Sequence, residues 1–231
     1  ELARVYDEGD PLLSEYGGLF VKAVADSNAA AQDKALDALN AFLSKATEKH
    51  ADRAVDKTCA NIVNKALGAR TGTVQRGTEA LLKYIELEQA SAVVDALVAG
   101  FTNKVPKVVV ACIEVVLQAI SAFGPKVIVP QPVLKTLPPL LESKDAKARD
   151  KAKELVVELS RWVGQELIRS ALFKDMRDVT KADIETAMQA VAAMGKPKPT
   201  RFTRKEQLRQ AALKAKEEAA GPVAAEGEAA G

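Results

Sequence analysis

The feature that most constrains the fold of this chain is a spacing, because apolar residues recur every three to four positions in one segment after another. This spacing gathers them on one side of an α-helix, whereas a half-buried strand needs strict alternation. The pattern predicts an all-α chain with helices near 11–26, 29–45, 51–67, 73–88, 90–101, 106–123, 131–143 and 146–163, and a last, broken one at 165–194.

The segment 29–45 shows the pattern most clearly. Its apolar stripe consists of Ala31, Ala35, Leu36, Leu39, Phe42 and Leu43, and the residues largely off the stripe are Gln32, Asp33, Lys34, Asp37 and Lys45. Helix ends carry suitable residues: Asn28 can cap a helix, Pro106 suits a first turn, and Gly124 stops a helix. The Pro138-Pro139 pair is expected to kink or split the helix at 131–143.

Short connections pair these helices into antiparallel hairpins. The pairs 11–26 with 29–45, 51–67 with 73–88, 90–101 with 106–123, and 131–143 with 146–163 have inner turns near residues 27, 71, 104 and 145. The steps of about 44, 33 and 41 residues are typical of HEAT and armadillo solenoids. Such hairpins must stack to bury their apolar stripes, so the inner turns should share one edge, the expected binding surface.

Composition and motifs argue against several classes. Apolar runs such as Val108–Ile113 are too short to span a bilayer, and two cysteines give neither a disulfide framework nor a zinc site. We therefore expect a reducing, cytosolic setting and no membrane. The single histidine, His50, has no partner motif, and the stretch 72–78 has the glycine spacing of a phosphate loop but Thr78 in place of its lysine. We predict neither an enzyme nor a cofactor or metal.

Charge divides the chain into two parts. Residues 196–216 carry eight Lys or Arg and one acid, and because residues 217–231 hold four Glu, the body at 1–195 has a net charge of −1. Basic runs are usually solvated, so we expect a disordered linker at 196–231, which is first basic and then of low complexity. We expect residues 1–195 to form one folded, monomeric domain. Because it begins at Glu1 without Met, we expect a fragment of a longer protein.

The inner turns gather polar and basic residues along one edge of this acidic body. The candidate binding residues there are Ser27, Asn28, Arg70, Asn103, Lys104, Lys107, Lys144, Lys147 and Arg149. The opposite edge also carries lysines, such as Lys45, so charge alone leaves open whether the basic residues at the inner turns are functional. Its natural partner is an acidic protein surface. Nucleic acid is not expected, since the body lacks a positive excess.

Two further residues carry separate expectations. Trp162 follows Leu155 and Leu159 at helical spacing, so we expect its ring to be buried in the core. Arg149 follows the fourth turn at the positive end of a helix, where the macrodipole gives it no local reason to be. An external carboxylate supplies such a reason, and the competing explanation is a weak pair with an acidic neighbour such as Glu142.

Several motifs at the turns resemble those of TOG domains, the tubulin-binding HEAT modules of microtubule polymerases. These motifs are Val24-Ala-Asp-Ser-Asn28 with Gln32-Asp-Lys-Ala-Leu-Asp-Ala-Leu39, Asn103-Lys-Val-Pro-Lys107, Ala122-Phe-Gly-Pro-Lys-Val-Ile128, Lys147-Ala-Arg149 with Arg161-Trp162, and Lys198-Pro-Thr-Arg-Phe-Thr-Arg204. The resemblance covers about residues 11–207 and is strongest to the first TOG domain of plant and green-lineage members.

The resemblance implies a flat paddle of six HEAT repeats whose inner-turn edge binds curved αβ-tubulin. It also implies a place on microtubules, plus ends and the spindle. The residues at matching positions are Ser27, Asn28, Arg70, Lys104, Lys107, Lys147 and Arg149. The aromatic residue of the family's first turn would lie before Glu1, which points either to weaker binding by this chain or to a first repeat that is partly disordered. Two alternatives remain: a HEAT adaptor that binds peptides in an apolar groove, and a microtubule-lattice binder that acts through the basic tail.

Overall fold

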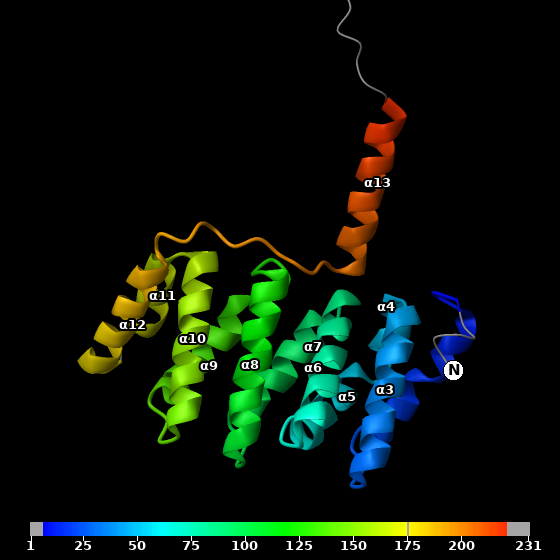
Figure 1. Ribbon diagram of the computed structural model, residues 1–231, viewed down its shortest axis with the longest axis horizontal. Helices are drawn as coiled ribbons and strands as arrows, with labels where there is room; N and C mark the ends of the chain where they lie inside the picture. Colours follow the sequence, from blue (N-terminus) through cyan, green and yellow to red (C-terminus); the bar gives the residue numbers. More distant parts are fainter. Residues whose placement is uncertain (1–6, 175, 221–231) are drawn as a thin grey trace, which may run out of the picture.

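A computed structural model describes residues 7–174 and 176–220, and in that part all regular structure is helical (Figure 1). Short elements come first: η1 (Pro11–Glu15), η2 (Gly17–Leu19) and, after the first helix pair, α4 (Glu48–Asp52). The helix pairs are α2 (Phe20–Ala23) with α3 (Ala29–Lys45), α5 (Val55–Asn61) and its π-helical continuation η3 (Ile62–Ala66) with α6 (Thr71–Glu86), α7 (Ala90–Gly100) with α8 (Pro106–Phe123), α9 (Pro130–Leu141) with α10 (Ala146–Val163), and α11 (Gln165–Leu172) with α12 (Asp178–Val191).

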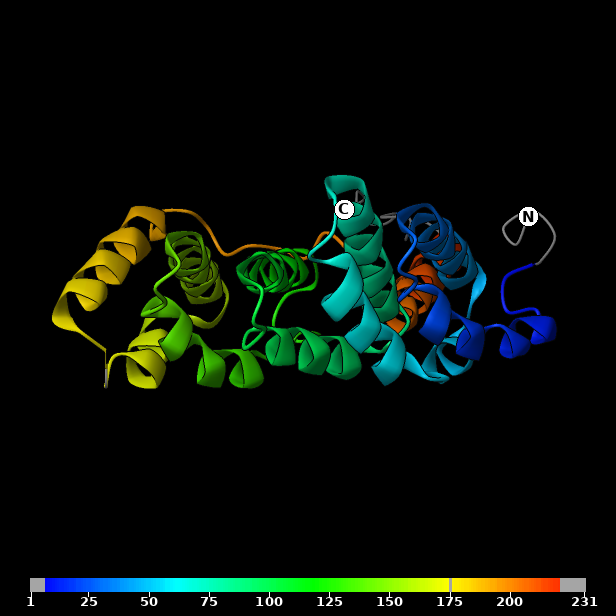
Figure 2. The ribbon, with the colours of Figure 1, turned by 90° about the horizontal axis from the view of Figure 1, so that it is seen from below.

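These pairs stack side by side into two layers. Helices α3, α6, α8, α10 and α12 form one layer, and α2, α5, α7, α9 and α11 form the other (Figure 2). The buried residues lie between the layers and include Leu36, Phe42, Tyr84, Ile120 and Leu155. This arrangement confirms the predicted HEAT-type solenoid.

The inner turns lie on a common edge, as predicted. In Figure 1 they follow one another along the lower edge of the molecule. Neighbouring turns are also joined directly, because Arg70 pairs with Asp33 of α3 and the Lys107 ammonium donates to the carbonyl of Ala69. We call the turns at 26–28, 69–73, 103–106 and 143–147, with the first turn of the helix after each, the turn edge.

The segment 11–26 departs from the predicted single helix. It forms two short 3-10 turns and the one-turn helix α2. Gly17 explains part of the difference, because glycine disfavours a continuous helix and here it packs closely. A Cβ atom at Gly17 would lie 3.1 Å from the carbonyl oxygen of His50.

Two other local expectations also need correction. The pair Pro138-Pro139 does not split α9, which runs unbroken to Leu141. Both prolines lie in its last turns and are exposed, so the helix loses only hydrogen bonds near its end. Gln32, placed off the stripe of α3, is buried, and its Nε2 donates to the carbonyl of Val24 at 2.9 Å. That bond ties α3 to the end of α2.

Helix α8 is more apolar than the sequence pattern suggested. It has 18 residues with a mean hydropathy of 1.7, which by length and composition alone would suffice to cross a membrane. In the fold, however, α8 packs against α7 and α10, and residues such as Cys112, Ile113 and Val116 are fully buried. A core helix at the centre of the stack accounts for the same composition.

Residues 196–203, which we call the strap, belong to the segment predicted as a disordered linker, and in the structure they lie along the edge opposite the turn edge (Figure 1). The amides of Thr200 and Arg201 both donate to the carbonyl of Ala122, at 2.8 and 2.9 Å. The Arg201 guanidinium bonds to Glu79 and Glu86, and Thr203 is buried. Composition could not predict where the strap lies, because the strap is held by one arginine whose two partners, Glu79 and Glu86, are far away in the sequence.

Helix α13 (Arg204–Ala220) follows the strap and stands out from the body (Figure 1). Its first residues are fixed to the first repeat, because Arg204 pairs with Glu8 at 3.4 Å and Lys205 pairs with Glu48 at 3.1 Å. The structure thus describes 196–220 as the strap and α13, and the predicted disorder of the linker stays a prediction. The remainder of the predicted low-complexity segment, 221–231, lies outside the described residues, and the domain boundary at 195 stays a prediction.

Trp162 is only partly buried, against the expectation of a core anchor. Its Nε1 donates to Glu158 at 2.9 Å, and its ring lies against Gly124, where a Cβ atom would come within 2.8 Å of the ring. The ring lines a groove of about 470 Å³ together with Pro197 and Pro199 of the strap. Trp162 is thus part of the floor on which the strap lies.

Replacing Gly100 by alanine is expected to destabilise the stack, although alanine normally favours a helix by about 1 kcal/mol. A Cβ atom at Gly100 would lie 2.4 Å from Sγ of Cys112 and 2.8 Å from Cγ1 of Val63. We expect Gly100→Ala to cost about 1–3 kcal/mol in urea unfolding. In the control Gly72→Ala the new methyl meets only the flexible end of Arg76, so unchanged or higher stability is expected. Equal stabilities for both variants would contradict the close packing.

Ending the chain after Gly195 is expected to lower its thermal midpoint, because the bonds of Arg201 to Glu79 and Glu86 are lost. For a domain of this size the drop should be about 5 °C or more. A chain that ends after Gln210 keeps the strap and should melt within about 2 °C of the full chain. Identical midpoints for all three chains, measured by circular dichroism, would show that the strap adds nothing to stability.

Candidate partner-binding edge

The first turn of the turn edge is polar and carries one acid, Asp26. Ser27 and Asn28 are exposed, and the Asn28 Oδ1 accepts from the amides of Ala30 and Ala31 at 2.9 and 3.1 Å. Asn28 therefore caps α3 as predicted, and Asp26 in turn accepts from the Asn28 amide. The Ser27 hydroxyl remains exposed on the edge.

The second turn carries a cation that is already paired. Arg70 is 61% exposed, and its guanidinium bonds to Asp33 of the preceding repeat. The hydroxyl of Thr73 also donates to Asp33, at 2.5 Å. The hydrogen bond from Thr73, and then that from Arg70, holds the pKa of the Asp33 carboxyl below its usual value. Arg70 thus joins two repeats as well as facing solvent.

The third turn contains the first basic residue without such a bond. Asn103 accepts from the Val105 amide at 2.9 Å and donates to Asn64 at 3.2 Å, so its amide shapes the turn. Lys107 donates to the Ala69 carbonyl. Lys104 is exposed and forms no ion pair with any described residue.

The fourth turn has the highest density of basic residues. Lys144 and Lys147 are exposed, and neither forms an ion pair in the part of the chain that the structure describes. Arg149 is half-buried, and its Nη1 donates to the carbonyls of Ser143 and Lys144 at 2.7 and 3.2 Å. Arg149 therefore has a local structural reason for its position, which corrects the sequence-based interpretation. It closes the turn after α9.

The structure thus sorts the predicted residues into two groups. Arg70, Asn103, Lys107 and Arg149 hold the turns in place through bonds to neighbouring groups. Lys104, Lys144 and Lys147, which form no ion pair with a described residue, project their charge from turns that are held in this way. Along the turn edge, the lysines without an ion pair to a described residue lie at the third and fourth turns, and the second turn separates them from the polar first turn with its acid, Asp26.

Sequence reasoning missed a fifth turn on the same edge. It joins α11 to α12, and there Arg177 pairs with Glu142 of the fourth turn, which also accepts from the Thr180 hydroxyl at 3.0 Å. The hydrogen bond from Arg177 is the main cause that lowers the pKa of Glu142. The predicted break within 165–194 was the available signal, but no turn residues were assigned to it.

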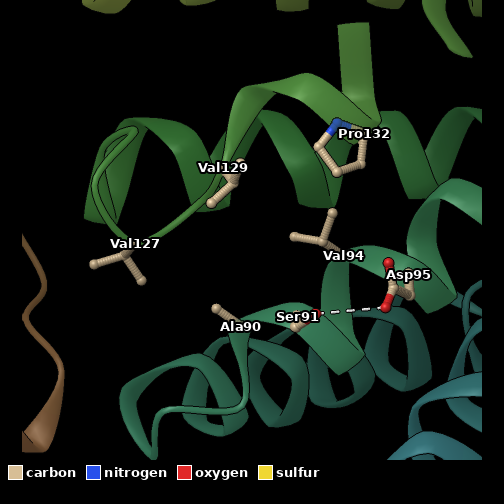
Figure 3. A pocket seen from close by; sticks show the side chains of 7 residues that line it. All are labelled: Ala90, Ser91, Val94, Asp95, Val127, Val129 and Pro132. Atoms are coloured by element: carbon tan, nitrogen blue, oxygen red, sulfur yellow. Dashed lines mark hydrogen bonds between the residues drawn. The ribbon is translucent and has the colours of Figure 1, made fainter. Parts of the chain in front are cut away.

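A pocket away from the turn edge offers little to a ligand. It measures about 170 Å³ and lies between the first turn of α7 and the segment that leads into α9 (Figure 3). Its lining is mostly apolar, and the Ser91 hydroxyl donates to Asp95 at 3.5 Å. Ligand pockets usually measure about 300–1,000 Å³, so this one does not favour a peptide-binding groove.

Comparison with known proteins agrees with this geometry. The family model described as "XMAP215/Dis1/CLASP, TOG domain" matches residues 2–188. Protein MOR1 of Arabidopsis thaliana is 41% identical over 96% of this chain and 11% of its own length. Protein mini spindles of Drosophila melanogaster is 34% identical over 92% of this chain and 10% of its own length. The chain thus spans about a tenth of these relatives.

Solved structures support the fold. One, described as the structural basis of tubulin recruitment and assembly by microtubule polymerases with TOG domain arrays, superposes with a TM-score of 0.80 at 19% identity, over 99% of this chain and 49% of that one. The third TOG domain of Drosophila melanogaster Mini spindles gives a TM-score of 0.70 at 18% identity, over 86% of this chain and 87% of that one. Taken with the family match, these findings show that the chain belongs to the XMAP215/Dis1/CLASP family of TOG domains.

Proposed function

We propose that the turn edge binds the αβ-tubulin heterodimer. Support comes from family membership and from the related TOG array described in terms of tubulin recruitment. The observation that carries the proposal is the set of unpaired lysines on structurally fixed turns: Lys104, Lys144 and Lys147. A row of cations whose supports are already bonded is preorganised for an acidic protein surface, so little ordering cost is left for binding.

Within a longer protein, this domain helps to deliver tubulin to microtubule plus ends. Its place would be the cytoplasmic microtubule cytoskeleton, including the spindle, where relatives such as the spindle pole body component alp14 of Schizosaccharomyces pombe are named. The domain acts as a binding module with no reaction of its own. Any nucleotide chemistry belongs to the tubulin that it holds.

The basic tail is a weaker candidate for the main binding surface. Half of its eight cations are bonded to acids within this chain: Arg201, Arg204, Lys205 and Arg209. The ion pairs of Arg201, Arg204 and Lys205 hold the tail to the body. The charge left for an outside partner is therefore smaller than composition suggests, and the turn edge is favoured.

Replacing Lys104 or Lys147 by alanine is expected to weaken tubulin binding without changing stability. Each lysine is an exposed point charge with no ion pair among the described residues, so folding should change by less than about 0.5 kcal/mol. Each variant should raise the dissociation constant roughly threefold to tenfold, more at low salt. Fluorescence titration with purified tubulin measures this effect.

The matched control is Lys49→Ala, which removes an exposed lysine in α4, away from the turn edge. It should bind as tightly as the unmodified chain. If Lys49→Ala and Lys104→Ala lost the same amount of tubulin affinity, the effect would come from net charge and not from the position of the lysine on the turn edge. Unchanged binding by the Lys104 and Lys147 double variant would refute the proposed edge.

Arg149→Ala is expected to affect folding and binding together. Its guanidinium bonds to the carbonyls of Ser143 and Lys144, so its loss should cost about 1–2 kcal/mol in urea unfolding. The fourth turn then loosens, and Lys144 and Lys147 are no longer held for the partner. Arg149→Lys keeps the charge but replaces the rigid, planar guanidinium by a flexible ammonium, and should recover less than half of the lost affinity. Full recovery by lysine would show that charge alone matters.

A further inference from the structure

The layer that presents most of the turn edge has one weak junction. Helix α6 packs extensively on α3, and α8 packs extensively on α10, but α6 and α8 touch each other over only a few residues. Figure 2 shows α8 nearly end-on while α6 runs obliquely past it. A groove of about 320 Å³ opens between them, lined by residues such as Val74, Leu82 and Gln118. We call this junction the seam.

The other layer is continuous behind the seam. Helix α7 packs against α5 on one side and against α9 on the other. The seam can therefore open and close about α7 as a hinge, without breaking that layer. Such a motion would separate the first two turns, which belong to α3 and α6, from the third and fourth, which belong to α8 and α10.

The strap crosses this seam and bonds to both of its sides. On the α8 side, the amides of Thr200 and Arg201 donate to the Ala122 carbonyl at 2.8 and 2.9 Å, and the Arg201 guanidinium lies 5.7 Å from the ring centre of Phe123. On the α6 side, Nε of Arg201 donates to Glu86 at 2.8 Å and Nη1 of Arg201 donates to Glu79 at 3.1 Å.

The side chain of Arg201 is well suited to this task. It is only 26% exposed, and its planar fork engages two carboxylates at once, which a lysine cannot do in the same geometry. Glu79 and Glu86 lie on α6 seven residues apart, so both face the strap from the same side of the helix. Loss of the guanidinium would leave these two carboxylates with the charge of Lys83 nearby, whose ammonium donates its hydrogen bonds to Asn40 and Ser44 instead.

We infer that Arg201 is a positioning residue for tubulin binding, which clamps the seam and thereby fixes the spacing between the two halves of the turn edge. The inference rests on the proposed function. Arg201 itself lies on the edge opposite the turns and does not touch the partner. Its effect comes from raising the fraction of molecules whose turns are correctly spaced before binding, since apparent affinity falls with that fraction.

Spin labels can measure this spacing without tubulin. One pair of sites, Ser27→Cys with Lys144→Cys, spans the seam, and a second pair, Lys104→Cys with Lys144→Cys, lies on one side of it. The native Cys59 and Cys112 are buried, and burial raises the pKa of both thiols, that of Cys112 to about 12, so neither should take the label. Pulsed electron spin resonance then gives both distance distributions.

Arg201→Ala in the full chain should broaden the distribution across the seam and leave the second one narrow. In parallel, its dissociation constant for purified αβ-tubulin should rise about fivefold, measured well below its thermal midpoint. The salt dependence of binding should stay unchanged, because no contact with tubulin has been removed. Arg201→Lys should give a distance distribution and a dissociation constant between those of the unmodified chain and those of Arg201→Ala. The control Arg209→Ala removes a cation that pairs only within α13, with Glu206, and should match the unmodified chain.

Two results would overturn the inference while leaving tubulin binding intact. One is a broadened distance across the seam with unchanged affinity. The other is a shallower salt dependence for Arg201→Ala and Arg209→Ala alike, which would mean that the strap contacts tubulin directly. A wild-type chain that does not bind tubulin would overturn the proposed function and this inference together.

Discussion

Each helix pair in this chain leaves an apolar stripe that only the next pair can cover, and the rest of the structure depends on that requirement. It forces the pairs to stack in one direction, so their turns fall in a row along one edge (Figure 1). Backbone and side-chain bonds between neighbouring turns, such as Lys107 to the Ala69 carbonyl, then set the spacing of that row. A surface for a large, rigid partner thus follows from how the core is buried.

Stacking is not equally extensive at every step, and polar contacts join neighbouring helices both where packing is extensive and where it is limited. Between α3 and α6, the Asp33 carboxylate accepts a hydrogen bond from Thr73 and pairs with Arg70 at the turn edge. Between α6 and α8 the apolar contact is limited, and there the strap supplies Arg201. The partly buried ion pairs of Arg201 therefore lie at the junction of this layer where helix–helix contact is smallest.

Local patterns were enough to predict the helices and the turn edge, because both depend on residues close in sequence. Asn28 as a cap and Pro106 at a first turn are cases of this kind. The strap could not be predicted, since Arg201 meets Glu79 and Glu86 across more than a hundred residues of chain. Arg149 was misread for a related reason. Its acceptors are backbone carbonyls, which every residue has and which no sequence pattern distinguishes.

The strap also determines where the chain leaves the domain. Glu8 and Arg204 are paired at 3.4 Å, so the polypeptide enters and exits beside the first repeat although almost two hundred residues lie between them. A mechanical load applied between the segments before and after the domain would pass through this short contact and the base of α13. Until this contact breaks, the five helix pairs of the described residues would carry little of that tension.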